Sequence, residues 1–303
     1  MKSKGPLKVV FVGLAGAGKT SIILAIDRNY EELSTVTPTR NVSTTEMKLL
    51  GLHVVRWDFG GQEQYRKRHL EQFEKYFAGA EVFFFVVSVR DPGEFEAASS
   101  FLKALVKALG DKRPTFAVLL HKFDPGARDD PDVQRAVVEA RRELGRHLRD
   151  FPHEFWETSV FYPSSVHAAF TETLLSRFPG GELVSIKLGE VAGELGASAV
   201  ALHDAGGFVF GRHVVPRSQI EDVVAFFEFV DDASQRVDPN SPTEMAVFAL
   251  SERADVAMSV FPVRKDAVVF SALLPAGRMA ADPGLQERFR RAAADLGGVL
   301  KIW

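Results

Sequence analysis

The sequence predicts an α/β domain with a mostly parallel sheet, followed by a smaller α+β domain. Near-continuous apolar runs of strand length alternate with helical stretches over residues 8–178, which is typical of a parallel sheet covered on both faces. After the turn-rich stretch FPGG (Phe178–Gly181), strand-like runs follow one another through short turns, which favours an antiparallel sheet. We therefore expect domains at residues 1–179 and 182–303, and the length of 303 residues agrees with two domains.

The composition is that of a globular protein without disulfides. Hydrophobic residues make up 46% and charged residues 25% of the chain, and the absence of cysteine excludes thiolate metal sites and fits a reducing cytoplasm. The net charge of −3 argues against general attraction to nucleic acid. Lys2 stands where myristoylation needs glycine, the C-terminus is no prenylation box, and no apolar run reaches about 18 residues. We expect no direct membrane anchor.

Strands and helices alternate along the first domain. The expected strands are 8–13, 52–58, 81–89, 115–121 and 154–160, and the expected helices are 20–30, 93–109 and 130–148. The last of these helices opens with Asp130 as N-cap and Pro131 in the first turn. Only Gly51 separates the run 44–50 from the strand that follows it, so we expect a hairpin there and one antiparallel edge strand.

The second domain is expected to follow the order helix, two strands, helix, three strands, helix. The expected helices are 183–196, 218–237 and 284–296, and the strands lie within 198–214, around a Gly-Gly turn, and at 245–252, 256–263 and 267–274. The motif SQIE predicts a capping box from Ser218 to Glu221 at the start of the middle helix. Residues 182–303 carry 17 acidic and 12 basic residues, a net charge of −5, which argues against a lipid- or nucleic-acid-binding module.

The middle helix of the second domain has an unusually wide apolar arc. The arc spans about 220° at 100° per residue, which is more than a helix lying on one sheet needs. Its members are Ile220, Val223, Val224, Phe226, Phe227, Phe229 and Val230. Two explanations remain open: either neighbouring elements of the chain cover both flanks, or the arc forms a protein–protein face, most simply a dimer interface.

The stretch GLAGAGKT (Gly13–Thr20) matches the phosphate-binding pattern G-x-x-x-x-G-K-[ST] between an expected strand and an expected helix. Its glycines allow backbone N–H groups to face one concave site, and the helix N-terminus adds partial positive charge. The phosphates are expected to meet the backbone of Ala15, Gly16, Ala17, Gly18, Lys19, Thr20 and Ser21. The Lys19 amine can reach the β- and γ-phosphates, and the Thr20 hydroxyl can bind Mg²⁺.

The stretch WDFGGQE (Trp57–Glu63) ends a strand with an aspartate and supplies the expected hydrolytic group. Asp58 is expected to help hold Mg²⁺, and the Gly61 N–H to contact the γ-phosphate. The Gln62 side chain is expected to orient the attacking water. Gln62 and Lys19 are therefore expected to be catalytic residues.

With these motifs in this order, residues 8–178 resemble the small GTPases of the Ras superfamily. WDFGGQE resembles the Arf, Sar and Rag/Gtr branches, and GLAGAGKT resembles the Arf phosphate loop. The resemblance makes Thr39 in TPTRNV the switch threonine, with Thr37 as the alternative. It implies that Thr39 is a third catalytic residue and a Mg²⁺ ligand beside Thr20 and Asp58. Ala15 departs from the arginine of Rag proteins and the aspartate of Arf proteins. Arg40 is a weak candidate for an arginine finger in cis.

The stretch HKFD (His121–Asp124) resembles the guanine-reading motif N-K-x-D, and its histidine is typical of the Rag/Gtr branch. The resemblance implies that Asp124 accepts hydrogen bonds from guanine N1–H and N2–H₂, while the stem of Lys122 lies against the purine. The ring of His121 replaces the bridging asparagine. ETSVF (residues 157–161) resembles the last guanine-binding loop of these proteins. The resemblance implies that Ser159 supports Asp124 and that the Val160 N–H faces the base oxygen.

The element order of residues 182–303 resembles the roadblock/longin family, and Rag/Gtr proteins join a GTPase domain to such a domain. The resemblance implies a homodimer, or a heterodimer with a related GTPase, through the second domain. It also implies docking on a roadblock-type scaffold, a GAP and an exchange factor. We expect a cytoplasmic protein that partners recruit to membranes.

Two functions follow from this pattern, and a third remains open. The first is a GTP/GDP switch that uses Mg²⁺ and hydrolyses GTP slowly, on the order of 10⁻⁴ to 10⁻² per second without an arginine finger. The second is a nucleotide-locked dimerisation scaffold that hardly hydrolyses. The third is a P-loop ATPase.

Overall fold

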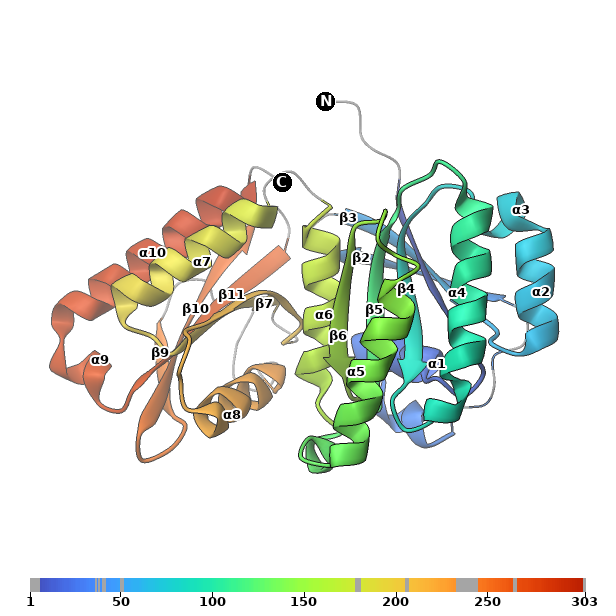
Figure 1. Ribbon diagram of the computed structural model, residues 1–303. Coiled ribbons are helices and arrows are strands. Elements are labelled where there is room, and N and C mark those ends of the chain that lie inside the picture. The colour runs from blue at the N-terminus through green and yellow to red at the C-terminus, as the bar shows by residue number, and fades with distance from the viewer. Residues whose placement is uncertain are drawn as a thin grey trace. The chain divides into compact units, whose positions relative to one another are not determined.

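The computed structural model describes residues 6–35, 37, 39, 42–49, 52–177, 181–204, 207–232, 245–263 and 266–301 (Figure 1). The chain divides into two compact units, Met1–Ala169 and Phe170–Trp303, and each unit contains one sheet. The division falls within α6 (Pro163–Leu175), so the end of this helix belongs to the second unit. Residues 178–180 of the expected linker lie outside the described residues, and the boundary at 179–182 stays a prediction.

A six-stranded sheet forms the centre of the first unit. Its order is β2-β3-β1-β4-β5-β6. The strands are β1 (Leu7–Gly13), β2 (Val42–Leu49), β3 (Leu52–Phe59), β4 (Ala80–Ser88), β5 (Thr115–His121) and β6 (His153–Thr158). All neighbours are parallel except β2, which pairs antiparallel with β3 at the edge. This confirms the predicted fold class and its antiparallel edge strand; residues 50 and 51 of the expected hairpin turn lie outside the described residues.

Helices cover both faces of this sheet. They are α1 (Lys19–Ile26), α2 (Glu63–Glu71), α3 (Phe73–Phe77), α4 (Phe95–Leu109), α5 (Pro131–Gly145) and α6, with short 3₁₀ turns η1 (Tyr30–Thr35), η2 (Pro92–Glu94) and η3 (Pro125–Ala127). One core cluster joins α3, α4 and α5 to alternate residues of the strands, including Val10, Phe83 and Phe116. Helices α1 and α6 are tied together by a hydrogen bond from the ring of His167 to the Ala25 carbonyl, 3.0 Å long.

The start of α5 is capped as predicted. Asp130 is the N-cap, its carboxylate accepts a hydrogen bond from the Asp132 amide at 2.9 Å, and Pro131 stands in the first turn. Proline fits this position because the first helical N–H groups have no partner within the helix.

The second unit is a five-stranded antiparallel sheet with helices on both faces, compatible with a longin-like domain. Its strand order is β8-β7-β11-β10-β9. The elements are α7 (Gly181–Leu195), β7 (Ala199–Asp204), β8 (Val209–Val214), α8 (Ile220–Asp231), β9 (Ala246–Ala249), β10 (Ala254–Val263), β11 (Asp266–Pro275), α9 (Arg278–Ala281) and α10 (Pro283–Lys301). Helices α7 and α10 pack side by side on one face, and α8 packs on the other (Figure 1).

The predicted capping box at α8 is wrong. The helix begins at Ile220 with Gln219 as N-cap, and no side chain caps it. The hydroxyl of Ser218 instead donates to the carbonyls of Ser198 and Val215, at 3.0 and 2.7 Å. A serine hydroxyl can donate to nearby backbone carbonyls instead of capping a helix. The SQIE pattern alone therefore could not decide between these two roles of Ser218.

The wide apolar arc of α8 is mostly covered within its own unit. Val223, Phe226, Phe227, Phe229 and Val230 are buried in a cluster with residues of β7, β8, β10 and β11. Only one member of the arc, Ile220, is strongly exposed, at 64%. Of the two explanations for the arc, coverage by neighbouring elements is therefore correct, and the arc is not a free dimer interface.

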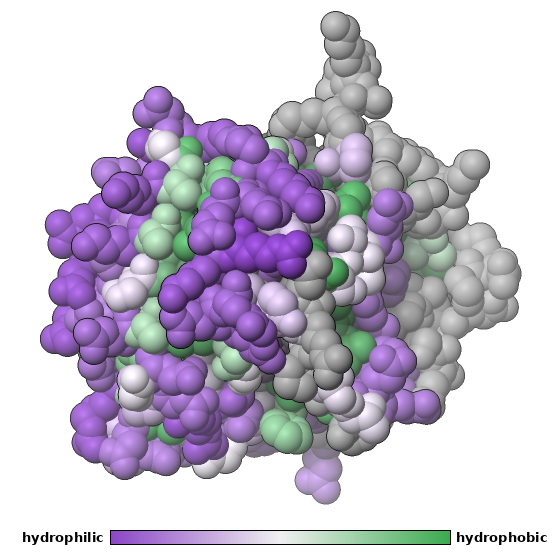
Figure 2. All heavy atoms as spheres, turned by 90° about the vertical axis from the view of Figure 1, so that its right-hand side faces the viewer, coloured by the Kyte–Doolittle hydropathy of each residue, from purple (hydrophilic) through white to green (hydrophobic). Residues whose placement is uncertain are grey.

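The face of the molecule near α2 and α3 is mostly hydrophilic, with small hydrophobic areas between polar side chains (Figure 2). This agrees with the sequence of α2, EQYRKRHLE, which buries only His69. Among the described helices, none combines the length and apolarity that crossing a bilayer requires.

Candidate functional site

The loop between β1 and α1 has a backbone that only glycine fits at two positions. Gly13 has φ +149°, and a Cβ there would lie 2.2 Å from the Val86 carbonyl oxygen. Gly18 has φ +101°, and a Cβ there would lie 2.4 Å from the Cδ2 atom of the His121 ring. The first glycine lets the loop leave β1 against β4, and the second brings it against the end of β5.

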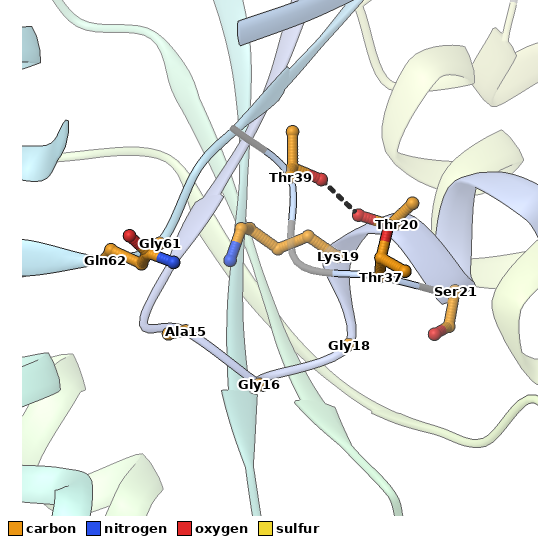
Figure 3. A pocket seen from close by; sticks show the side chains of 10 residues that line it. All are labelled: Ala15, Gly16, Gly18, Lys19, Thr20, Ser21, Thr37, Thr39, Gly61 and Gln62. Atoms are coloured by element: carbon orange, nitrogen blue, oxygen red, sulfur yellow. Dashed lines mark hydrogen bonds between the residues drawn. The ribbon is translucent and has the colours of Figure 1, made fainter. Parts of the chain in front are cut away.

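A pocket of about 290 Å³ opens above this loop (Figure 3). It is lined by Ala15, Gly16, Gly18, Lys19, Thr20, Ser21, Thr37, Thr39, Gly61 and Gln62. Thus the predicted phosphate loop, both candidate switch threonines and the predicted hydrolytic glutamine share one cavity. Ala17 belongs to the predicted loop but is buried and is not among the residues that line the pocket. The N-terminus of α1 faces the cavity and favours an anion there.

The amine of Lys19 is held inside this pocket. It donates to the carbonyls of Leu14 at 2.7 Å and Gly13 at 3.3 Å, and the residue is only 6% exposed. Burial lowers the pKa of Lys19 to about 8, the nearby Asp58 carboxylate raises it, and Arg66 lowers it. A buried ammonium group with two carbonyl contacts gains strongly from an anionic ligand.

Three oxygen-bearing side chains meet beside Lys19. The Thr20 hydroxyl donates to Asp58 Oδ2 at 2.8 Å, the Thr39 hydroxyl donates to the same oxygen at 2.9 Å, and the two hydroxyls lie 2.7 Å apart. Burial raises the pKa of Asp58, and the hydrogen bonds from Thr20 and Thr39 lower it. Thr37 also lines the pocket, but these contacts favour Thr39 as the switch threonine.

This group of oxygens fits Mg²⁺. Hydroxyl and carboxylate oxygens are the ligands that this hard cation prefers, usually with phosphate oxygens and water. Within the part of the chain that the structure describes, Asp58 Oδ1 is buried and has no hydrogen-bond partner. A buried carboxylate oxygen without a partner is costly, so a cation or its bound water would stabilise it.

Gly61 and Gln62 lie on the opposite side of the pocket from Ser21 (Figure 3). A Cβ on Gly61 would lie 2.4 Å from the Leu14 carbonyl group, so the Gly61 backbone rests directly on the phosphate loop.

Gln62 is the N-cap of α2, and its Oε1 accepts a hydrogen bond from Gln64 at 3.2 Å. The guanidinium of Arg66 donates to the Gly61 carbonyl, and no motif predicts this contact. In the sequence, the contact is indicated only by the position of Arg66, which lies in the first turn of α2.

The predicted guanine readers gather where β5 and β6 end. The Ser159 hydroxyl donates to Asp124 Oδ1 at 2.6 Å, and the same hydroxyl accepts from the Phe161 amide at 3.0 Å. Val160 follows in the same turn and is half-buried. Lys122 has φ +63°, an uncommon conformation for a residue with a side chain. This arrangement leaves the Asp124 side chain partly exposed, at 26%, with the Ser159 hydroxyl on its Oδ1 atom.

The ring of His121 connects these readers to the phosphate loop. It is buried, Nδ1 lies 3.0 Å from the Thr158 hydroxyl, and its other edge contacts Gly18. Burial lowers the pKa of His121 to about 4, although Asp124 opposes this shift, so the ring is neutral at pH 7. A neutral imidazole can bridge two elements as the asparagine of related motifs is expected to do.

Replacing His121 with asparagine is expected to reduce acid destabilisation. Its pKa is lower in the folded than in the unfolded chain, so the unfolded chain binds the proton first and stability falls as the pH drops from 6.5 to 4. The shift of the His121 pKa from 6.5 to about 4 corresponds to about 3 kcal/mol of folding stability that the wild type loses on acidification. The His121→Asn variant should not show this loss. Urea unfolding at several pH values measures this slope.

The buried ring of His69 provides the comparison, because burial also lowers its pKa to about 4. His69→Asn should remove a similar part of the slope, and the double variant should remove both. Equal slopes in wild type and His121→Asn would contradict the burial of a neutral His121 in solution.

Arg40, the weak candidate for an arginine finger, lies outside the described residues. Two further charged residues without a motif, Arg90 and Asp91, reach the guanine readers from the end of β4. The only signal for them in the sequence is their place after an apolar strand that neighbours β5.

Known proteins resemble this chain over its first unit and part of its second. The Gtr1/RagA G protein conserved region matches residues 8–232. GTP-binding protein GTR1 of Saccharomyces cerevisiae is 28% identical over 173 residues, 53% of this chain and 56% of that protein. ADP-ribosylation factor-like protein 1 of the same yeast is 32% identical over 138 residues, 45% of this chain and 71% of that protein.

A third relative, ADP-ribosylation factor-like protein 3 of Chlamydomonas reinhardtii, is 29% identical over 90 residues, 30% of this chain and 48% of that protein. The chain thus spans about half the length of GTR1 and about half the length of the Chlamydomonas relative. A solved structure, the Arl6 BBS3 small GTPase from Trypanosoma brucei with bound GppNp, aligns with a TM-score of 0.45 and 21% identity, over 56% of this chain and 96% of that one.

The predicted resemblance to the Rag/Gtr type, with Arf-like motifs, is confirmed by these matches. The conserved region extends over well more than half of the chain, from β1 to the end of α8. The chain therefore belongs to the Gtr1/RagA family of G proteins.

Proposed function

We propose that this protein is a GTP-binding switch that hydrolyses GTP to GDP and phosphate. The observation that carries this proposal is the meeting of Thr39, Thr20 and Asp58 beside Lys19, in a pocket that Gly61 and Gln62 also line. Two separate loops therefore contact the place where a γ-phosphate would lie. Loss of that phosphate removes the ligand that holds both loops, so their conformations report the nucleotide state.

The residues of the pocket divide the work of hydrolysis. Lys19 neutralises charge on the β- and γ-phosphates, and the Gly61 N–H stabilises the γ-phosphate. The Gln62 side chain accepts a hydrogen bond from the attacking water and aligns it with the bond that breaks, which joins the γ-phosphorus to the bridging oxygen. Mg²⁺, when held by Thr20, Thr39 and Asp58, adds further neutralising charge. Gln62 Oε1 accepts a hydrogen bond from Gln64 and keeps a second lone pair for the water.

Nucleotide released from the purified protein by denaturation tests the base directly. Chromatography is expected to identify GDP or GTP, because Asp124 and Ser159 form the acceptor that guanine N1–H and N2–H₂ require. Recovery of ATP or ADP alone would favour the P-loop ATPase and overturn the guanine assignment.

Gln62→Leu is expected to slow single-turnover GTP hydrolysis by at least about tenfold, because leucine cannot orient water. GDP affinity should change little, since Gln62 lies at the γ-phosphate end of the pocket. Release of phosphate from bound GTP over hours is the measurement.

Gln64→Leu is the matched control, because Gln64 is exposed and carries the same side chain two residues away. It should hydrolyse GTP at about the wild-type rate, since it keeps the Gln62 side chain. If wild type and Gln62→Leu both retained the γ-phosphate over hours, the non-hydrolysing scaffold would be the better description.

We further propose that the protein pairs with a second copy or with a related GTPase through its second domain. Family membership supports this proposal, and so do the exposed apolar side chains of that domain. They include Leu183 and Ile186 on α7, at 56% and 53% exposure, Ile220 and Val247. The same proposal includes docking on a roadblock-type scaffold and regulation by a GAP and an exchange factor. It also includes a cytoplasmic location and recruitment to membranes through partners.

Analytical ultracentrifugation of the full chain with GDP and with a slow GTP analogue tests pairing. A monomer in both states would exclude the homodimer.

A further inference from the structure

Strand register brings a pair of opposite charges next to the guanine readers. Strands β4 and β5 are parallel neighbours, Ser88 stands opposite His121, and the Val89 amide donates to the His121 carbonyl at 2.9 Å. The next two residues after β4 are Arg90 and Asp91. They therefore leave the sheet beside the segment that follows His121.

The two segments are joined by crossed ion pairs. The Arg90 guanidinium lies 3.7 Å from Asp124 Oδ2, and the Lys122 amine lies 3.3 Å from Asp91 Oδ2. Each positive side chain of one segment thus meets a negative side chain of the other. The four side chains are between 26% and 49% exposed, so each pair is individually weak in water. Two pairs between the same short segments restrict each other and fix the spacing between them.

Both oxygens of Asp124 are then oriented by different elements. Oδ1 accepts from the Ser159 hydroxyl at 2.6 Å, and Oδ2 faces Arg90. Lys122, two residues earlier, has the unfavourable φ of +63°, so this segment needs contacts from outside to keep its conformation. Asp91 supplies such a contact through the Lys122 amine. The carboxylate plane is therefore set by β6 on one side and by the end of β4 on the other.

We propose that Arg90 and Asp91 are positioning residues for guanine specificity: they hold Lys122 and Asp124 so that both carboxylate oxygens meet the N1–H and N2–H₂ edge of the base. This inference rests on the proposed binding of guanine nucleotides. A carboxylate turned out of plane keeps one hydrogen bond and loses the other. Loss of Arg90 therefore weakens guanine binding more than binding of hypoxanthine, which has N1–H but no 2-amino group.

The test uses the full-length protein, freed of nucleotide, with GDP and IDP as probes in equilibrium titrations. Arg90→Gln is expected to weaken GDP binding about threefold to fivefold and IDP binding less, so the preference for GDP over IDP falls. Asp91→Asn should act in the same direction through Lys122. Arg135→Gln is the matched control, because Arg135 forms an exposed ion pair with Asp132 within α5. It should leave both affinities unchanged.

A double-variant comparison separates positioning from a general effect on the fold. In an Asp124→Asn background, with XDP as probe, Arg90→Gln should have no further effect, because the carboxylate that Arg90 faces is gone. The inference is overturned if Arg90→Gln binds GDP like wild type, if it weakens GDP and IDP equally, or if it weakens XDP binding in the Asp124→Asn background. A wild-type chain that does not prefer GDP to IDP or ADP would overturn the proposed function itself, which is a separate result.

Discussion

Replacing Asp124 with asparagine is expected to change the preferred base from guanine to xanthine. The Asp124 carboxylate accepts from Ser159 and is expected to accept two further hydrogen bonds from guanine. An amide in its place points a donor at the guanine 2-amino group, whereas the 2-carbonyl of xanthine accepts that donor. Losing one partner of a charged, hydrogen-bonded pair corresponds to about 10²–10³ in affinity for GDP.

Competition between GDP and XDP for the nucleotide-free variant measures this change. Asp129→Asn is the control: Asp129 is exposed, lies five residues further along the same loop and undergoes the same chemical change. It should keep the wild-type preference for GDP. If Asp124→Asn still preferred GDP by the wild-type margin, the HKFD segment would not be the guanine reader, and the pocket would have to bind its base elsewhere.

The central strands could be predicted because they are apolar runs with sharp ends, as in FAVLLH of β5, which is buried along its whole length. Helices α2 and α6 could not be predicted in this way. The sequence of α2 is almost entirely polar, and its one buried side chain, His69, packs against the rings of Phe59 and Tyr76. Tertiary contact and not periodicity therefore decides this helix.

The motif residues of the site could be predicted because their chemistry depends on short backbone segments. A glycine at 13 or 18 is required by the loop's own φ values and by what a Cβ would meet. The contacts of Arg90 and Asp91 depend on the register between β4 and β5, which a motif does not contain. The apolar arc of α8 is a second example. Its width can be counted from the sequence, but its coverage depends on how the helix packs against the sheet of the second unit.

Lys19→Met is expected to weaken GDP and GTP binding by about 10²–10³, because it removes the positive charge that faces the phosphates while keeping a side chain of similar length. The nucleotide-free chain should be no less stable. Burial already disfavours the charged amine, as its pKa of about 8 indicates, and methionine needs no partner in the same space. Affinity and stability should therefore change independently, which separates a lost ligand contact from a damaged fold.

Equilibrium titration gives the affinities, and thermal unfolding of the nucleotide-free protein gives the stability. Lys107→Met is the matched control, because Lys107 is exposed on α4 and loses the same charge outside the pocket. It should bind GDP like wild type. If Lys19→Met also bound GDP within about threefold of wild type, its amine would not contact phosphate, and the hydrogen bonds to Leu14 and Gly13 would be its whole role. A large loss of stability together with affinity would instead show that those two hydrogen bonds hold the loop closed, so that the burial of the charge is outweighed by its carbonyl contacts.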